Sequence, residues 1–118
     1  MLNRFIEGVK AGQVVDFKDT LAVITEHYDY TASEFSNGLQ QPLINQVGQN
    51  EGSCKIFAFA KLHNLDKQQT LALFGDFYRK DVLENPDGND HQNIRTFMRD
   101  GWDGILFKSE VLKLKHAD

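Results

Sequence analysis

Apolar residues recur at helical spacing in several segments of the chain, and this pattern predicts a domain built mainly from helices. Four apolar residues share one face of the first segment, which ends at Gly12: Leu2, Phe5, Ile6 and Val9. Further helices are expected from Asp16 to about residue 26, and over residues 53–63, 66–79 and 90–101. Asp66 and Gln69 have the spacing of a capping box. The segment 53–63 is apolar over much of its circumference, which is typical of a central helix.

Shorter apolar runs beside turn residues predict strands. Residues 31–35 precede the turn pair Asn37-Gly38, and residues 102–107 follow the helix stop at Gly101. We expect 31–35 and 104–107 to share a small sheet. The amide-rich stretch 39–52 is expected to be an ordered loop with one short strand, and 111–115 is either a strand or a last helical turn. The expected fold class is α+β: a single domain over residues 1–118, with about five helices around an aromatic core and a small β-sheet.

Composition narrows the possible functions. The 118 residues suit one domain, and the net charge of −4 comes from 17 acidic and 13 basic side chains that are interspersed. This charge pattern argues against binding to nucleic acid or to an anionic membrane surface. One cysteine permits no internal disulfide, and neither a signal peptide nor an apolar stretch of membrane-spanning length is visible. We expect a cytoplasmic monomer.

Cys54 is the sharpest candidate for chemistry, because it lies where a glycine-rich loop becomes a helix. A helix N-terminus and the neighbouring Lys55 both lower the pKa of a thiol. One hypothesis is therefore a small hydrolase or transferase with Cys54 as nucleophile and His91 as base. In this hypothesis Asp90 or Asn93 orients the base, and the N–H groups of Ser53 and Cys54 stabilise an oxyanion. The alternative is that Cys54 packs as a small apolar residue in the first turn of a buried helix.

Other cofactor chemistry has little support in the sequence. Gly48 and Gly52 are one residue too close for a phosphate-binding loop, and Ser53 and Cys54 separate Gly52 from Lys55. No zinc spacing exists among the histidines, which are His27, His63, His91 and His116. We expect no metal and no cofactor. A binding module then remains as the second hypothesis, with an unidentified protein or small molecule bound at a polar cleft around Asn50 and Asp90.

Two arginines and the single tryptophan lead to further expectations. Arg95 and Arg99 lie four residues apart and share a helix face, with Arg79 as a further member of the group. They either bind an anionic ligand together with Asn50 and Ser53, or they pair with nearby acids. Trp102 is expected to be largely buried, and its indole N–H is expected to reach a main-chain carbonyl or an amide of the loop 39–52.

Three stretches together resemble the HopJ-type family, named for a type III effector of plant-pathogenic bacteria. They are Asn50-Glu-Gly-Ser-Cys-Lys-Ile-Phe-Ala-Phe59, Asp90-His-Gln-Asn-Ile-Arg95-Thr-Phe-Met98 and Gly101-Trp-Asp-Gly-Ile105 with Phe107. The resemblance implies no reaction, substrate or settled catalytic residues. A binding module is favoured over the cysteine enzyme because the sequence contains no complete catalytic signature. The resemblance implies secretion into a host cell for relatives, whereas residues 1–16 carry no diagnostic signal. The residues here that fall in its motifs are Cys54, Asp90, His91, Asn93, Arg95, Trp102 and Asp103.

Overall fold

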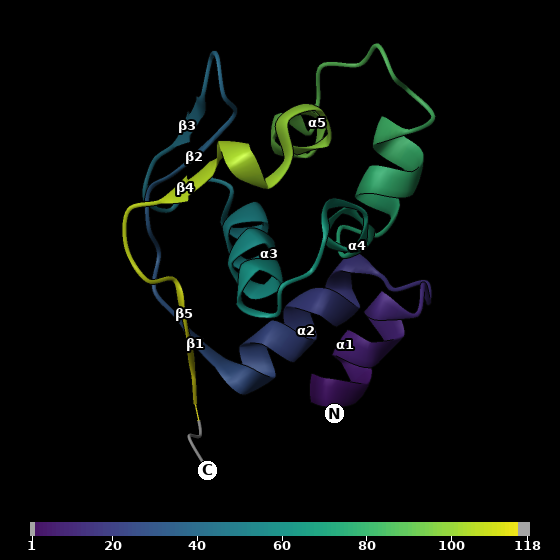
Figure 1. Ribbon diagram of the computed structural model, residues 1–118, viewed down its shortest axis with the longest axis vertical. Coiled ribbons are helices and arrows are strands. Elements are labelled where there is room, and N and C mark those ends of the chain that lie inside the picture. The colour runs from purple at the N-terminus through teal and green to yellow at the C-terminus, as the bar shows by residue number, and fades with distance from the viewer. Residues whose placement is uncertain (1, 116–118) are drawn as a thin grey trace.

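The computed structural model describes residues 2–115, and it confirms an α+β fold (Figure 1). Within these residues, two helices are followed by three short strands, then by five helical segments and two further strands. In order, the elements are α1 (Leu2–Lys10), α2 (Phe17–His27), β1 (Tyr28–Tyr30), β2 (Phe35–Asn37), β3 (Leu43–Asn45), α3 (Glu51–Leu62), α4 (Lys67–Ala72), the π-helix η1 (Phe77–Val82), α5 (Gln92–Asp100), the 3₁₀ helix η2 (Gly101–Gly104), β4 (Ile105–Phe107) and β5 (Leu112–Leu114).

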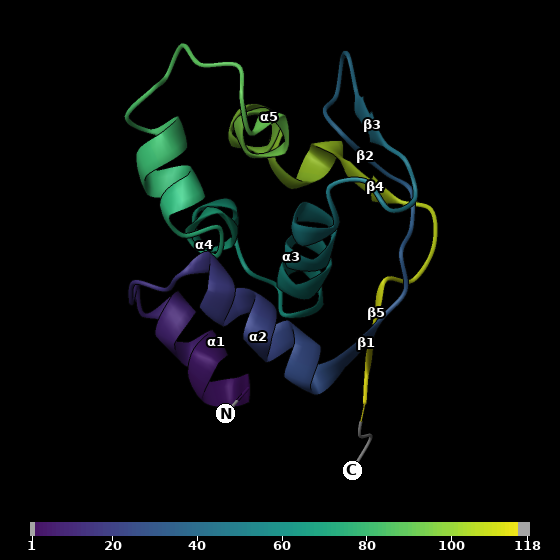
Figure 2. The ribbon, with the colours of Figure 1, turned by 180° about the vertical axis from the view of Figure 1, so that it is seen from behind.

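Helix α3 is the centre of the fold, as its apolar circumference predicts. It lies between the strands on one side and the remaining helices on the other (Figures 1 and 2). Six consecutive or near-consecutive residues of this helix are buried: Cys54, Ile56, Phe57, Ala58, Phe59 and Ala60. The Phe57 ring contacts the rings of Phe35, Phe74, Phe97 and Trp102 at centroid distances of 4.9–6.4 Å. The core is therefore aromatic, as the nine phenylalanines suggest.

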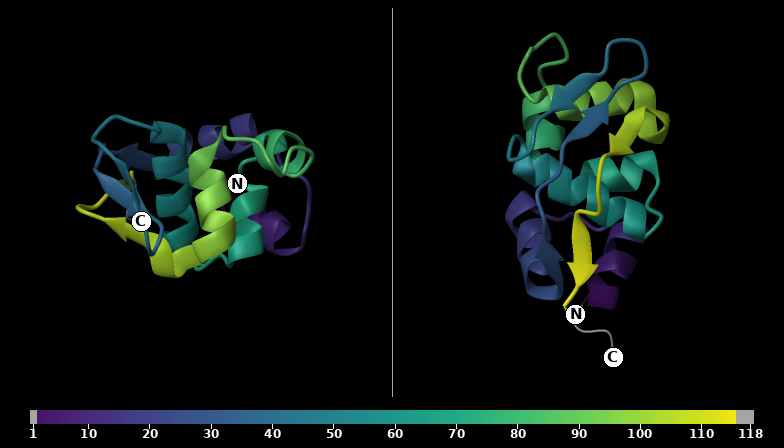
Figure 3. Two further views of the ribbon diagram at one scale, coloured as in Figure 1. Left: turned by 90° about the horizontal axis from the view of Figure 1, so that it is seen from above. Right: turned by 90° about the vertical axis from the view of Figure 1, so that its left-hand side faces the viewer.

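The strands form two small antiparallel sheets. The three-stranded sheet has the order β3-β2-β4, and the two-stranded sheet pairs β1 with β5 (Figure 3). The expected strand at 31–35 is wrong in position, since residues 31–34 are an irregular connection between the two sheets. Ser33 stabilises this connection, because its hydroxyl accepts a hydrogen bond from the Ser109 N–H at 3.1 Å. For residues 111–115 the sequence left a strand and a helical turn open, and the structure has the strand β5, in which Leu112 lies opposite Tyr30.

The helix expected over 66–79 is interrupted. Its start is confirmed, because Asp66 Oδ1 accepts from Gln69 N–H at 2.8 Å and Gln69 Oε1 accepts from Asp66 N–H at 2.9 Å. The α-helix ends at Ala72, however, and Gly75 then adopts a φ of +62° before η1 begins. A Cβ atom at Gly75 would lie 2.6 Å from the main-chain nitrogen of Phe17. The interruption therefore lets the start of α2 pack directly against this turn.

Trp102 is only partly buried, whereas a largely buried side chain was expected, and it lies in η2, where a strand was expected. Its indole N–H donates to the carbonyl of Leu65 at 3.0 Å, and its ring packs edge-on against Phe97. The expected bond to a main-chain carbonyl is confirmed. Because the acceptor lies in the connection between α3 and α4, Trp102 links α5 to that connection and not to the loop 39–52.

Folding stability is expected to fall in mild acid through His63. Burial is the main cause that lowers the pKa of His63, the charge of Lys10 adds to it, and the ring nitrogen Nε2 lies within hydrogen-bond distance of the Tyr28 hydroxyl. The unfolded chain, with a histidine pKa of about 6.5, then binds protons more readily than the folded chain. The contribution of His63 to folding stability is present above the pKa of the unfolded chain. It is lost as the pH falls through the lower pKa that His63 has in the folded chain. Melting temperatures at pH 7.5 and 5.5 should differ less for His63→Gln than for the wild type; an equal difference would contradict this assignment.

Candidate functional site

A pocket of about 360 Å³ lies where the N-terminal ends of α3 and α5 approach each other. Apolar side chains form part of its wall, and polar residues from the starts of both helices form the rest. The apolar residues are Phe17, Leu43, Phe74, Phe77 and Ile94, the polar ones are Asn50, Ser53, His91, Gln92 and Asn93, and Gly52 completes the lining. An apolar wall with a few convergent polar groups is the usual composition of a small-ligand site.

Four asparagines form a hydrogen-bonded cluster, the asparagine cluster, behind this pocket: Asn37, Asn45, Asn50 and Asn93. Asn93 Oδ1 accepts from the amides of Asn37 at 3.1 Å and Asn45 at 3.2 Å, and its own amide donates to Asn45 Oδ1 at 2.9 Å. Asn50 donates to the same Asn45 oxygen at 2.6 Å. Asn37, Asn45 and Asn93 are at most 6% exposed. Asn37 belongs to β2, Asn45 to β3 and Asn93 to α5, and Asn50 is the N-cap residue of α3. The cluster therefore fixes the starts of both helices relative to the sheet.

Both helices begin without a side-chain cap. The N-cap residues Asn50 and His91 have left-handed backbone conformations, with φ of 52° and 49°, and neither side chain accepts a hydrogen bond from its own helix. Side chains of the N-cap ordinarily satisfy one of the first N–H groups of a helix. Left-handed conformations are costly for residues other than glycine and occur often at functional sites. The pocket therefore lies against the starts of two helices whose first N–H groups receive no hydrogen-bond acceptor from the side chain of the N-cap residue.

His91 is held at the pocket by η1. Its Nε2 atom lies 3.0 Å from Asp81 Oδ2, and its ring stacks against Phe77 with centroids 5.1 Å apart. Both partners come from the same π-helix, a type of helix that is rare and often marks functional sites. The side chain of His91 is 28% exposed and remains accessible from the pocket. This geometry orients the imidazole ring, and the other ring nitrogen, Nδ1, takes part in none of the side-chain hydrogen bonds of the described residues.

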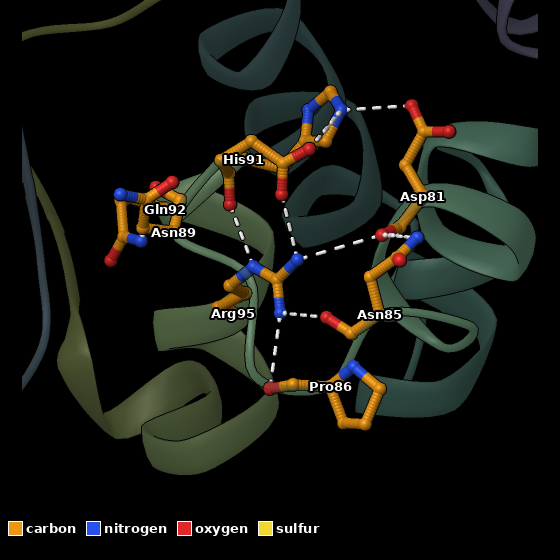
Figure 4. Close-up of polar contacts among 8 residues, drawn as sticks. Asp81, Asn85, Pro86, Asn89, His91, Gln92 and Arg95 are labelled. Carbon is orange, nitrogen blue, oxygen red and sulfur yellow. Dashed lines mark hydrogen bonds and ion pairs between the residues drawn. The ribbon is translucent and has the colours of Figure 1, made fainter.

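Arg95 does not reach the pocket, because the main chain of the loop before α5 surrounds its guanidinium (Figure 4). The guanidinium donates to the carbonyls of Asn85 at 2.9 Å and Asp90 at 2.7 Å, and to the Asp90 carboxylate at 2.7 Å. The hydrogen bond from Arg95 is the main cause that lowers the pKa of Asp90. A Cβ at Gly88 would lie 2.7 Å from the guanidinium, so the loop is closely fitted around it. Arg95 therefore ties the loop 83–91 to α5.

Replacing Arg95 by alanine is expected to destabilise the fold by about 2–3 kcal/mol, since several charge-assisted hydrogen bonds to loop carbonyls are lost together. Arg95→Lys should restore only part of this, because a lysine cannot reproduce the planar fork. Urea unfolding of both variants measures the effect. An Arg95→Ala protein as stable as the wild type would show that the loop holds its shape without the guanidinium.

The other two arginines of this group pair with nearby acids, which is the second of the two alternatives for these side chains. Arg99 makes a bidentate pair with Asp100, with both bonds at 3.0 Å, which is the main reason that the pKa of Asp100 is lowered. Arg79 lies 3.3 Å from Asp76 and donates to the carbonyl of Val15 at 3.0 Å. Neither residue lines the pocket, and neither does Asp90. Of the predicted ligand-binding residues, Asn50 and Ser53 lie at the pocket.

Cys54 points into the core and not into the pocket. Its side chain is 1% exposed, and its sulfur lies 4.0 Å from the carbonyl of Ser33. Burial is the main cause that raises the pKa of this thiol, which is opposite to the lowering expected from its place at a helix start. Among the bonds of residues 2–115, no hydrogen bond joins Cys54 to His91; Asp81 and Asp90 are the acidic partners of the histidine. The arrangement is that of a packed apolar residue and does not assemble the proposed catalytic group.

Cys54 is accordingly expected to resist alkylation in the folded protein. A thiol with raised pKa and almost no exposed surface presents little thiolate to a reagent. Mass spectrometry after iodoacetamide treatment at neutral pH should find the chain unmodified in buffer and singly modified in denaturant. Rapid modification of the folded protein at mildly acidic pH would instead revive the nucleophile hypothesis.

The sequence does not single out several residues of the pocket or its surroundings. Phe17 and Phe77, which line the pocket, have the pattern of ordinary helix-face residues. Asp81, Asn37 and Asn45, which hold lining residues in place, have the pattern of surface, turn and loop residues. A usable signal was the frequency of asparagine at predicted turns, since buried amides can satisfy irregular backbone. Within residues 2–115, no three side chains of histidine, cysteine or acidic type gather as a metal site would require; His116 lies outside the described residues. No described helix has the length and apolar character needed to cross a membrane.

Comparison with known proteins gives a consistent result. The model of the HopJ type III effector protein family matches residues 2–112. A crystal structure of the unknown-function protein VPA0580 superposes with a TM-score of 0.91 at 47% identity, over 98% of this chain and 94% of that one. No curated protein matches this chain significantly. Because the family match spans nearly the whole sequence, including all three stretches that suggested it, the chain belongs to the HopJ type III effector protein family.

Proposed function

We propose that this protein is a non-enzymatic binding module whose ligand site is the pocket between α3 and α5. The observation that carries the proposal is the pocket itself: about 360 Å³, bounded by the uncapped starts of two helices. The asparagine cluster supports it, because a buried polar network that costs free energy to assemble fixes the geometry of the pocket wall. The ligand is a small molecule, or a side chain of a protein partner, that fills the apolar part and accepts hydrogen bonds at the rim.

The polarity of the rim determines which groups suit the ligand. Main-chain N–H groups near Gly52 and Gln92 and the hydroxyl of Ser53 are donors, so the complementary groups are carbonyl, carboxylate or phosphate oxygens. His91 is able to donate or accept according to its tautomer. The rings of Phe17 and Phe77, 4.9 Å apart edge to face, favour an apolar or planar portion. Cysteine catalysis gains no comparable support, since the thiol is absent from the pocket lining.

Thermal-shift screening tests this function. Fragments of a library of small carboxylates, amides and aryl phosphates should raise the melting temperature of the wild type, because binding to the folded state alone stabilises it. Ser53→Phe places a ring at the pocket rim and should remove these shifts. Arg99→Ala changes an exposed residue outside the pocket and should keep them.

Absence of any stabilising fragment would oppose the proposal. So would hits that stabilise Ser53→Phe as strongly as the wild type, because such fragments bind elsewhere. Circular dichroism of Ser53→Phe should match that of the wild type, which separates a blocked pocket from an unfolded chain.

A further inference from the structure

A second hollow, the α3–β5 groove, lies on a different part of the molecule from the pocket and shares no lining residue with it. It has a volume of about 430 Å³ and lies between α3 and the chain segment that joins β4 to β5. Helix α3 contributes Ala58, Lys61 and Leu62, and the segment contributes Phe107, Ser109, Glu110, Val111 and Leu112. Most of these side chains are apolar, so the groove is an apolar surface exposed to solvent, and such surfaces often mark binding sites.

The segment side of this groove is an unpaired strand edge. Within residues 2–115, β4 pairs only with β2 and β5 only with β1, and β4 and β5 follow one another along one side of the molecule (Figure 3). The Lys108 N–H donates to the carbonyl of Glu34, just before β2, at 3.1 Å, and the Val111 carbonyl accepts from the Thr31 N–H, just after β1, at 2.8 Å. Neighbouring residues of a strand direct their N–H and C=O groups to opposite edges. Phe107 and Leu112 therefore direct theirs away from β2 and β1, and both residues line the groove.

The charges and the exposed apolar side chains at the rim of the α3–β5 groove restrict which partner can bind there. Leu62 and Leu114 are 53% and 51% exposed, so apolar contact area is available on both sides. Lys61 Nζ lies 5.8 Å from the centre of the Phe107 ring, and none of the ion pairs of the described residues includes Lys61. The segment 105–115 adds Lys108, Lys113 and Lys115 against Glu110, in a chain whose net charge is −4. Lys108 lies 3.5 Å from Glu34, whereas Lys113 and Lys115 take part in none of the ion pairs of the described residues. The rim is thus a locally basic surface on an acidic protein.

We propose that the α3–β5 groove binds an extended, acidic segment of a partner protein, which adds as a strand beside β5. The unpaired main-chain groups of Phe107 and Leu112 select an extended peptide, since a helix has no free main-chain groups to pair with them. An apolar side chain of the peptide fills the groove between Ala58 and Leu112. An acidic side chain next to it pairs with Lys61, and this charge determines which peptides bind.

A synthetic peptide tests the proposal: Ser-Glu-Val-Leu-Val-Glu-Ser, acetylated and labelled for fluorescence anisotropy. Binding to the full chain should be saturable below about 1 mM, the weak end of specific recognition, and should shift the amide NMR signals of Phe107 and Leu112. The same peptide with N-methyl groups on alternate residues of the pairing edge should not bind, because strand addition needs those N–H groups. Replacing its two glutamates by lysines should also remove binding.

Protein variants locate the site. Lys61→Glu should weaken binding about tenfold, and Leu62→Asp should abolish it; both positions are exposed, and circular dichroism verifies that the variants fold. Lys18→Glu, an equal charge reversal at an exposed position on α2, is the matched control and should bind as the wild type does. No saturable binding, equal binding of the N-methylated peptide, or equal binding to Lys61→Glu would each overturn the proposal. A concentration-dependent dimer that itself shifts the Phe107 and Leu112 amides would overturn it in favour of a second copy of this chain.

Discussion

Replacing Asn93 by alanine is expected to destabilise the protein by about 2–4 kcal/mol, a large share of the stability of a domain of this size. The side chain makes three hydrogen bonds to Asn37 and Asn45, which are themselves buried. Truncation removes all three and leaves a small cavity in the asparagine cluster. Because the buried amides keep only part of their bonding, the loss exceeds that of a surface hydrogen bond. Urea unfolding measures the change directly.

Asn89→Ala is the matched control for this prediction. Asn89 has the same side chain and lies in the loop before α5, but it is exposed and makes its bond to Gln92 through its main-chain carbonyl. Its truncation should change stability by less than about 0.5 kcal/mol. If Asn93→Ala lowered the free energy of unfolding as little as Asn89→Ala, the asparagine cluster would not stabilise the fold and would not hold the pocket wall in shape.

Gly75→Ala is expected to destabilise by about 3 kcal/mol or more, because two penalties combine at this position. The φ of +62° is unfavourable for alanine, and its Cβ would lie 2.6 Å from the Phe17 nitrogen and 3.2 Å from the Asp16 carbonyl carbon. Main-chain atoms cannot rotate away as the end of a side chain does, so the start of α2 must move. Thermal unfolding should show the loss.

Gly12→Ala separates the two penalties. Gly12 has a φ of +84°, but a Cβ there would meet no atom within 4 Å. Only the backbone penalty of roughly 1–2 kcal/mol then applies. Equal destabilisation of the two variants would mean that the close approach of α2 to the α4–η1 turn has no energetic weight.

Local signals predicted the helices well, because helix starts and apolar faces depend on neighbouring residues. The capping box of Asp66 and Gln69 is one confirmed example. The break at Gly75 was missed since Leu71, Phe74 and Tyr78 continue the helical spacing across it. The reason for the break is a contact with Phe17, which is distant in sequence. Strand β1 was missed for the same kind of reason, because its partner β5 lies at the other end of the chain.

The site was predictable only in part. The sequence predicts a polar cleft around Asn50 and Asp90. Asn50, Ser53, His91 and Asn93 line one pocket, whereas Asp90 lies outside its lining. Cys54 illustrates the limit, because its position at a helix start suggested a reactive thiol, whereas packing decided that its pKa rises. Arg95 is similar: its charge suggested either an anionic ligand or nearby acids as partners, and the shape of the loop 83–91 decided that main-chain carbonyls and the Asp90 carboxylate surround it. Such outcomes depend on long-range packing, which no local pattern specifies.

A crystal structure with a stabilising fragment bound would show whether the pocket between α3 and α5 is a binding site. We expect density for the fragment in this pocket, with its oxygen atoms within hydrogen-bond distance of the main-chain N–H groups near Gly52 or Gln92, and its apolar part against Phe17 and Phe77. An empty pocket, with the fragment bound elsewhere on the protein, would mean that this pocket is not the ligand site.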